Sequence, residues 1–336
     1  MDNIKKRVLW IDLLKAISML FVMLGHIDFC PSQWSYFYGP FFLSAFLFAS
    51  GYTFNNKRSF SEFFINKVKT LLVPMFIFSL INIGSRLLLT FNNDQTISQD
   101  IKDCFFQIRG KNDELWFIAC IFGASIVFYF VNKLINKQKI FIITILLLCF
   151  CSIIYDKTIG IPLPWHIQMY GSACFYMGLG SLYKQNENKL RKFINYYSLM
   201  LTLIMYFIIV SMQYVYKQGD PIVFYNYGQS ILRYFTISGL GLAMILQIVN
   251  LIPNIKLLSF IGRNSFIYYA FHGKVESLIL VVLKKSEVLS QQVINGKMIL
   301  LLIIYLILEV ILLIPVTIII NRYFPFMLGR SKVRNY

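Results

Sequence analysis

The chain has 336 residues, of which 57% are hydrophobic and only 14% are charged. A soluble domain carries about a quarter charged residues, so this composition excludes an ordinary water-soluble fold. The formal net charge of +17 would suit a nucleic-acid-binding protein. However, the cations lie in short clusters between apolar segments rather than along one polar face, which argues against nucleic acid as a partner. The pattern instead predicts an all-α integral membrane protein surrounded by membrane lipid.

The apolar segments are long enough to cross a hydrocarbon core of about 30 Å, which takes about 20 helical residues. In chain order the expected spans are residues 8–27, 37–54, 71–91, 114–132, 140–155, 166–183, 195–215, 228–250, 265–283 and 298–321. The sequence therefore predicts a bundle of about ten transmembrane helices. Shorter amphipathic helices are expected over 98–109 and 253–264.

The distribution of Lys and Arg orients this bundle. With the N-terminus in the cytoplasm, the cytoplasmic segments carry more than twice as many Lys and Arg residues as the opposite loops. Such enrichment is typical of cytoplasmic loops, so both termini are expected to be cytoplasmic. We expect residues 1–336 to form a single transmembrane domain with no appended soluble domain. The six cysteines show no metal-site spacing, and no metal is expected.

Ionisable residues inside a span cost several kcal/mol unless they face protein or water, so each one is a functional hypothesis. A helical rise of about 1.5 Å per residue sets the depth of each residue and predicts two polar layers. The outer layer would hold His26, Asp28, Arg86, Glu114 and Arg233, and the middle layer would hold Lys15, His272, Lys274, Glu276 and Glu309.

These residues also have structural interpretations. Lys274 and Glu309 could form an ion pair that fixes helix packing, and His272 could be a satisfied interior histidine. Arg86 and Arg233 could extend to the outer interface. His26 is harder to explain in this way, because it ends a span that also carries Lys15 and because Asp28 follows two residues later.

The first span carries a family resemblance. Residues 7–26 read RVLWIDLLKAISMLFVMLGH, which resembles the opening helix of acyltransferase family 3, membrane proteins that O-acylate cell-surface glycans. That family has a basic residue, ten intervening residues and a histidine in its first span. Lys15 and His26 match these two positions, and Asp12 matches the acidic position before them.

Later segments follow the family pattern in the same order. They are FFLSAFLFASGYTF with Ser50 and Gly51, the Leu115–Trp116–Phe117 signature, FYMGLG at 175–180 and SFIYYAFH at 265–272. The segment FFINKVKTLLVPMF departs from the pattern, since Lys67 and Lys69 replace the usual arginines at a different spacing. The resemblance covers most of the chain.

The resemblance implies transfer of an acyl group, most often acetyl, from coenzyme A to a sugar hydroxyl. His26 would be the general base, and Asp28 or Glu114 would orient its ring; a covalent acyl-histidine is an open variant. Arg86 or Arg233 would stabilise the oxyanion or hold the glycan acceptor, and Trp116 would stack on sugar rings. His272 is a further substrate-binding candidate. Cations at the inner face would bind the coenzyme A phosphates, and the candidates are Lys15, Arg7, Arg58, Lys67, Lys69 and Arg263.

This interpretation places the protein as a multi-pass enzyme in a bacterial inner membrane, with acetyl-coenzyme A as donor and a surface polysaccharide or its precursor as acceptor. A homo-oligomer stays an open alternative. The competing function is a polysaccharide or lipid-glycan exporter or flippase, which would have no use for a thioester donor.

Overall fold

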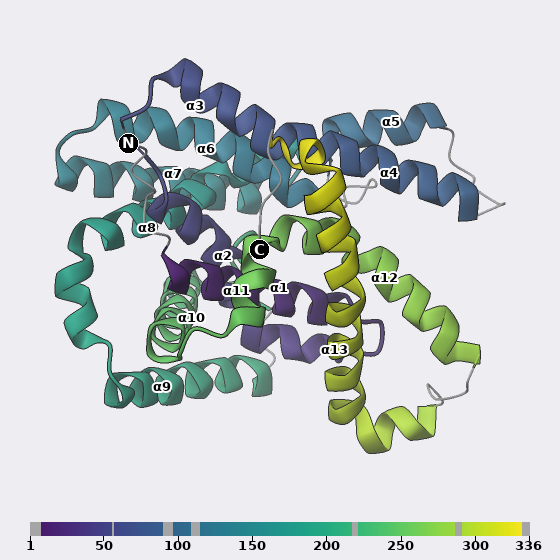
Figure 1. The fold of residues 1–336 in the computed structure, drawn as a ribbon. Coiled ribbons are helices and arrows are strands. Elements are labelled where there is room, and N and C mark those ends of the chain that lie inside the picture. Colours follow the sequence, from purple (N-terminus) through teal and green to yellow (C-terminus); the bar gives the residue numbers. More distant parts are fainter. Residues whose placement is uncertain are drawn as a thin grey trace. The chain divides into compact units, whose positions relative to one another are not determined.

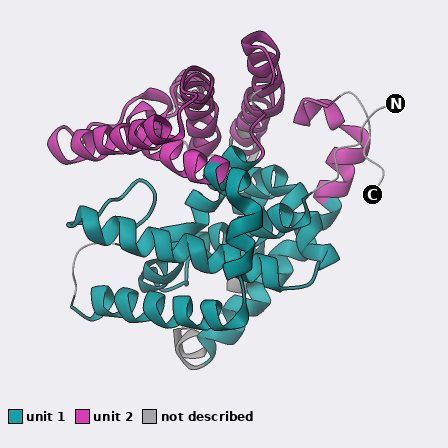
Figure 2. Cartoon of the chain, turned by 90° about the vertical axis from the view of Figure 1, so that its left-hand side faces the viewer, with its two compact units in different colours: residues 1–52, 182–315 teal, residues 53–181, 316–336 magenta. Residues whose placement is uncertain are grey.

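The computed structural model describes residues 8–55, 57–89, 97–108, 115–216, 221–285 and 291–330, without the side chains of 86–89, 283–285 and 291–296. The described residues form helices and contain no strand, and one isolated bridge pairs Val223 with Asn226 (Figure 1). The all-α prediction is confirmed. The chain divides into two compact units, Met1–Tyr52 with Leu182–Pro315 and Thr53–Ser181 with Val316–Tyr336 (Figure 2).

The first unit contains most of the complete helices of the N-terminal and C-terminal parts of the chain. They are α1 (Leu9–His26), η1 (Ser32–Trp34), α2 (Ser35–Tyr52), η4 (Arg191–Phe193), α9 (Tyr196–Val215), α10 (Ile231–Leu251), α11 (Lys256–Arg263) and α12 (Ser265–Lys285). The unit also contains the last part of α8 (Tyr170–Leu190) and most of α13 (Gln291–Tyr323).

Helix α1 is the centre of the first unit, and α2, α10, α11 and α12 all pack against it. Leu14, Ala16 and Met19 of α1 are fully buried. Helix α11 approaches the α1 backbone very closely, because a Cβ atom on Gly262 would lie 1.8 Å from the carbonyl oxygen of Asp12. Only glycine fits at this contact, and it fixes where α12 begins alongside α1.

The second unit is a separate helical body. It contains α3 (Phe60–Lys67), the π-helical turn η2 (Val68–Leu72), α4 (Val73–Leu89), α5 (Ile97–Phe106), α6 (Trp116–Leu134), α7 (Gln138–Thr158), η3 (Pro164–Met169) and η5 (Pro325–Leu328), together with the first part of α8 and the end of α13. Helix α3 begins at a capping box, in which Ser59 and Glu62 satisfy each other's backbone amides. The ring of Phe63 stacks on Tyr129 of α6 at 4.9 Å.

Seven of the described helical segments are long and apolar enough to cross a membrane. They are Leu9–His26, Phe60–Ser85, Trp116–Leu134, Gln138–Thr158, Tyr196–Val215, Ile231–Leu251 and Lys297–Tyr323. The membrane character is thereby confirmed. The other three predicted spans coincide with α2, α8 and α12, which are helices of suitable length but do not meet the same measure of apolarity. The amphipathic helices expected over 98–109 and 253–264 are present as α5 and α11.

Candidate active site

Two histidines from separate helices meet in the first unit. His26 is the last residue of α1, and His272 lies in α12; their ring centroids are 4.8 Å apart with an interplanar angle of 66°. The His26 side chain is exposed, whereas His272 is only 8% exposed. The prediction that these two residues occupy different depths is therefore wrong. The ring contact places residue 272 of α12 at the level of residue 26 of α1.

The hydrogen bonding of His272 fixes its tautomer. Its Nδ1 atom lies 2.9 Å from the carbonyl oxygen of Tyr269. A carbonyl oxygen can only accept a hydrogen bond, so Nδ1 must carry the proton and donate. In the neutral ring this leaves the lone pair on Nε2, which can accept a proton or a hydrogen bond.

Two buried carboxyl groups come from α12, one turn after His272, and from α13. One oxygen of Glu276 has no hydrogen-bond partner among the described residues, and the carboxylate lies within hydrogen-bonding reach of the Asp28 backbone amide. Glu309 is 1% exposed, lies within electrostatic range of Glu276, and has no partner for either oxygen in the described part of the chain. The alternative of a Lys274–Glu309 ion pair stays open, although no hydrogen bond links Glu309 to a described residue. We call His26, Asp28, His272, Glu276 and Glu309 the histidine cluster.

Tyr305 connects α13 to this cluster. Its hydroxyl donates to the backbone carbonyl of Glu276 at 2.9 Å, and its ring packs edge-on against Phe29 at 5.5 Å. These contacts bring Glu309, four residues further along α13, to the carboxylate of Glu276. The histidine cluster therefore draws its residues from α1, α12 and α13, and it contains both an imidazole lone pair and carboxyl oxygens without partners among the described residues.

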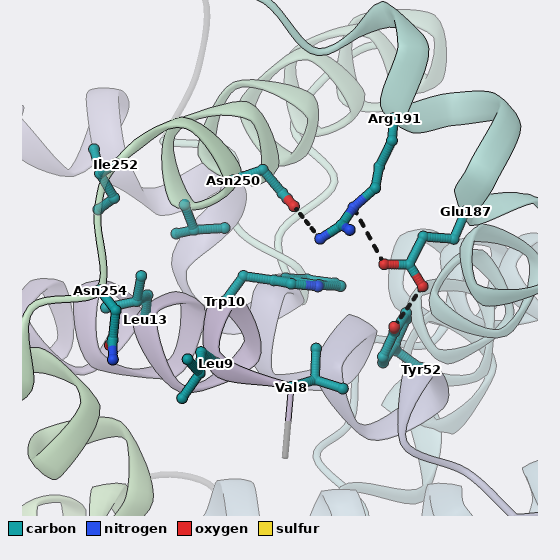
Figure 3. Close-up of a pocket in the computed structure, with 11 residues that line it drawn as sticks. Val8, Leu9, Trp10, Leu13, Tyr52, Glu187, Arg191, Asn250, Ile252 and Asn254 are labelled. Atoms are coloured by element: carbon teal, nitrogen blue, oxygen red, sulfur yellow. Dashed lines mark hydrogen bonds and ion pairs between the residues drawn. The ribbon is translucent and has the colours of Figure 1, made fainter. Parts of the chain in front are cut away.

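A cavity of about 540 Å³ lies at the opposite end of α1. Its walls come from the start of α1, the ends of α2, α8 and α10, and the connection that follows α10 (Figure 3). All these residues belong to the first unit. We call this cavity the inner pocket, since the charge distribution predicts that this end of α1 is cytoplasmic.

The polar groups of the inner pocket form one connected network. Tyr52 donates to the carboxylate of Glu187 at 2.6 Å, and Arg191 pairs with the same carboxylate at 3.4 Å. Arg191 also donates to the side-chain oxygen of Asn250 at 3.3 Å, as Figure 3 shows. Trp10 packs edge-on against Tyr52 at 4.8 Å, so its indole has a fixed orientation in the pocket.

Comparison with known proteins decides the family. The family model described as an acyltransferase domain matches residues 8–322, nearly the whole chain. The chain belongs to acyltransferase family 3. No curated protein and no solved structure matched it. The resemblance drawn from the first span and the later motifs is confirmed, and the protein is an acyltransferase of this family with several helices that can cross a membrane.

Among the described residues, none of the cations predicted to bind coenzyme A lines the inner pocket of the acyltransferase. Arg263 pairs with the buried carboxylate of Asp12 at 3.5 Å. Lys15 lies partly buried on α1. The remaining candidates are Arg58 and Lys69, which are exposed in the second unit, Lys67, which lies over the Phe63 ring at 5.6 Å, and Arg7, which lies outside the described residues.

The other predicted site residues are scattered. Arg233 is in the first turn of α10, where its backbone amide donates to the Ser230 side chain. Trp116 belongs to the second unit and packs on the buried ring of His166 at 4.9 Å. Glu114 and the side chain of Arg86 lie outside the description. Among the described residues, no group of three or more His, Cys, Asp or Glu side chains is arranged to hold a metal ion.

Sequence reasoning missed the inner pocket. Arg191 is one of many cations in the predicted cytoplasmic segments, and no sequence pattern marks Trp10, Glu187 or Asn250 as site residues. A weak signal did exist, since aromatic and polar residues gather at the predicted cytoplasmic ends of four helices. That signal does not show which ends lie together, and only the packing of α1 against α2 and α10 brings them into one site.

Proposed function

We propose that this acyltransferase moves an acetyl group from cytoplasmic acetyl-coenzyme A to a hydroxyl of a bacterial surface polysaccharide or its precursor, in the inner membrane. The observation that carries the proposal is the His26–His272 pair, 4.8 Å apart between ring centroids. Family membership supplies the reaction class. The cluster supplies groups that can handle a hydroxyl proton.

In the proposed reaction His26 takes the proton of the acceptor hydroxyl while the sugar oxygen attacks the thioester carbonyl carbon. The carbon–sulfur bond of the resulting tetrahedral intermediate then breaks, and the imidazolium returns the proton to the departing thiolate. The products are the acetyl ester and coenzyme A, so no other reactant is needed. General-base help of this kind contributes about 10²–10⁴-fold.

His272 supports His26 in this proposal. Its Nδ1 proton is held by the Tyr269 carbonyl, so its Nε2 can accept a hydrogen bond beside His26. Asp28 is the cluster carboxylate closest in sequence to His26, and we assign it the role of stabilising the charged ring. The corresponding role for Glu114 stays a prediction.

The unsatisfied oxygens of Glu276 and Glu309 favour a substrate that carries several hydroxyl groups, since each hydroxyl can donate a hydrogen bond. A buried acceptor atom without a partner is costly, and a sugar presents several hydroxyl donors to match such atoms. His26 ends α1 on the side opposite the inner pocket, which suits an acceptor that arrives from the outer face while the donor enters from the cytoplasm.

The test is transfer of labelled acetyl from acetyl-coenzyme A to surface glycan in membranes containing wild type or His26→Ala at matched expression. We expect the variant to lose about 10²–10⁴-fold in rate. The control is Ser277→Ala, which removes an exposed hydroxyl of α12 that bonds only within its own helix, to the Gly273 carbonyl. Full activity in His26→Ala would remove His26 from the chemistry. Absence of transfer by wild type, with glycan export lost on deletion, would favour the exporter.

A further inference from the structure

A groove of about 710 Å³ lies in the first unit, beyond the end of α1. One wall is the connection that follows α1, with Pro31 and Trp34, and the other wall is the part of α13 from Lys297 to Ile303. The volume lies within the range of small-molecule sites. We call this cavity the outer groove, since the charge distribution predicts that the end of α1 lies at the outer face of the membrane.

The α13 wall of the outer groove is apolar and exposed. The side chains of Ile299, Leu300 and Ile303 are 63%, 54% and 52% exposed. The apolar surface continues along α13 through Ile307 and Ile311, which are 53% and 54% exposed. In a helix long and apolar enough to cross a membrane, such a surface faces lipid hydrocarbon, so the groove is continuous with the bilayer. A hydrocarbon chain can therefore enter the groove without passing through water.

The outer groove also carries a positive charge. Lys297 is exposed, and it begins the span Lys297–Tyr323, so its ammonium group lies at the level of the lipid head groups. In the part of the chain that the structure describes, no acidic side chain pairs with Lys297. Trp34, on the opposite wall, is the kind of amphipathic ring that is enriched at the same level. Lysine binds phosphate as a point charge, so the groove fits a lipid that carries phosphate at the end of its chain.

The outer groove lies next to the histidine cluster. Pro31 follows His26 by only five residues. Between them, Phe29 packs edge-on against Tyr305 of α13 at 5.5 Å. Met298 lines the groove seven residues before Tyr305, so the two side chains share one face of α13 and are about 10 Å apart along its axis. Because Tyr305 connects α13 to the cluster, a molecule with its chain in the groove can present its head group to His26.

We propose that the outer groove binds the lipid chain of an acceptor whose glycan is linked to the lipid through phosphate, with Lys297 pairing with that phosphate and the sugar next to His26. This proposal rests on the proposed function for the glycan, and it narrows the acceptor to a lipid-linked precursor. Bilayer lipid is as apolar as the groove, so burial of the chain contributes little affinity and the charge pair selects the ligand. The groove residues position the acceptor and do not touch the reacting atoms.

Lipid binding to the purified full-length protein tests the proposal, with a polyprenyl monophosphate as the probe and native mass spectrometry as the measurement. We expect Lys297→Gln to weaken binding about fivefold, and Ile303→Trp, which fills the groove, to weaken it at least as strongly. The matched controls are Lys102→Gln, at an exposed cation of α5, and Ile311→Trp, at a residue of α13 that is as exposed as Ile303 but does not line the groove. Unchanged affinity in both groove variants, or equal binding of phosphatidylglycerol, would overturn the proposal.

A second measurement separates this inference from the proposed function. Acetyl transfer is compared between a lipid-linked glycan and the same glycan released from its lipid. Lys297→Gln should raise KM about fivefold for the first acceptor and leave kcat and the second acceptor unchanged, whereas equal effects on both acceptors would show a merely structural role. His26-dependent transfer with lipid binding indifferent to Lys297 and Ile303 refutes the groove assignment alone. Lys297-dependent lipid binding without any acetyl transfer refutes the proposed function alone.

Discussion

The two ends of α1 differ in which of their polar groups lack partners. At the His26 end the unsatisfied atoms are acceptors, namely one oxygen of Glu276 and both oxygens of Glu309. At the Trp10 end the unsatisfied atoms among the described residues are the Trp10 indole nitrogen and the hydroxyl of Tyr183, while Tyr52 and Arg191 each contact the carboxylate of Glu187. The two ends therefore differ in kind: one gathers buried carboxyl oxygens without partners, and the other ties its carboxylate into a network with a tyrosine and an arginine.

The two ends of α1 also differ in how closely other helices pack against them. Asp12, near the inner pocket, is held by Arg263 at 3.5 Å and by the close approach of Gly262. His26, at the other end, is an exposed helix-terminal residue that faces a buried partner from α12. At the inner end α1 is packed closely against α11, whereas at the outer end the accessible ring of His26 rests on a buried residue of α12. This is the arrangement that a reactive residue requires.

The largest effect is expected from the histidine pair. His26→Ala and His272→Ala should each lower acetyl transfer, His26→Ala by about 10²–10⁴-fold, and the double variant should cost little more than His26→Ala alone. The reason is that the two rings, 4.8 Å apart, act on one proton transfer. Rates of labelled acetyl transfer in a double-mutant cycle check this. Strictly additive losses would contradict a shared role.

The next largest effect is expected where Gly262 of α11 packs against Asp12 of α1. Gly262→Ala would place a methyl group 1.8 Å from the backbone oxygen of Asp12, so α11 and α12 must shift away from α1. We expect a loss of about 1–3 kcal/mol in stability, with reduced function at both ends of α1. Thermal unfolding in detergent measures this loss. Gly273→Ala, where a Cβ meets nothing within 4 Å, is the matched control and should be near neutral.

A smaller effect should distinguish the site of the glycan acceptor from the site of acetyl-coenzyme A. Glu309→Gln replaces one carboxyl oxygen of the histidine cluster with an amide donor at nearly constant shape. We expect KM for the glycan acceptor to rise by up to about tenfold and KM for acetyl-coenzyme A to stay unchanged, because one hydrogen bond contributes about 0.5–1.5 kcal/mol. Steady-state kinetics with each substrate varied in turn measure the two KM values. A rise confined to acetyl-coenzyme A would reverse the assignment of the two ends.

The smallest effect is expected at the rim of the inner pocket. Tyr52→Phe removes the 2.6 Å hydrogen bond to Glu187 but leaves the ion pair with Arg191 in place. One such bond contributes about 0.5–1.5 kcal/mol, so KM for acetyl-coenzyme A should rise by no more than about tenfold. Kinetics with saturating acceptor measure this change. Tyr197→Phe, a 90% exposed residue of α9, is the control, and a similar effect there would show that the change is not specific to the pocket.

The candidate site was predictable only in part. His26 and His272 were both identified from their place in apolar segments and from the family pattern, but they were assigned to different layers. Depth counted along each span fails here because it does not register how far two packed helices are offset along their axes, and the His26–His272 contact reveals that offset. Arg263 shows the opposite case, since a cation predicted to bind a ligand is engaged with Asp12 inside the protein.

The sequence by itself determined the helical membrane character, the family and the identity of the two histidines, because these depend on apolar segment length and on residue spacing within single helices. The tertiary structure decided that His26 meets His272, that Glu276 and Glu309 keep unsatisfied oxygens beside them, and that four helix ends enclose Trp10 and Arg191. The physical reason is that each of these features depends on contacts between residues far apart in the chain. Such contacts follow from how helices pack, and spacing within one helix does not encode them.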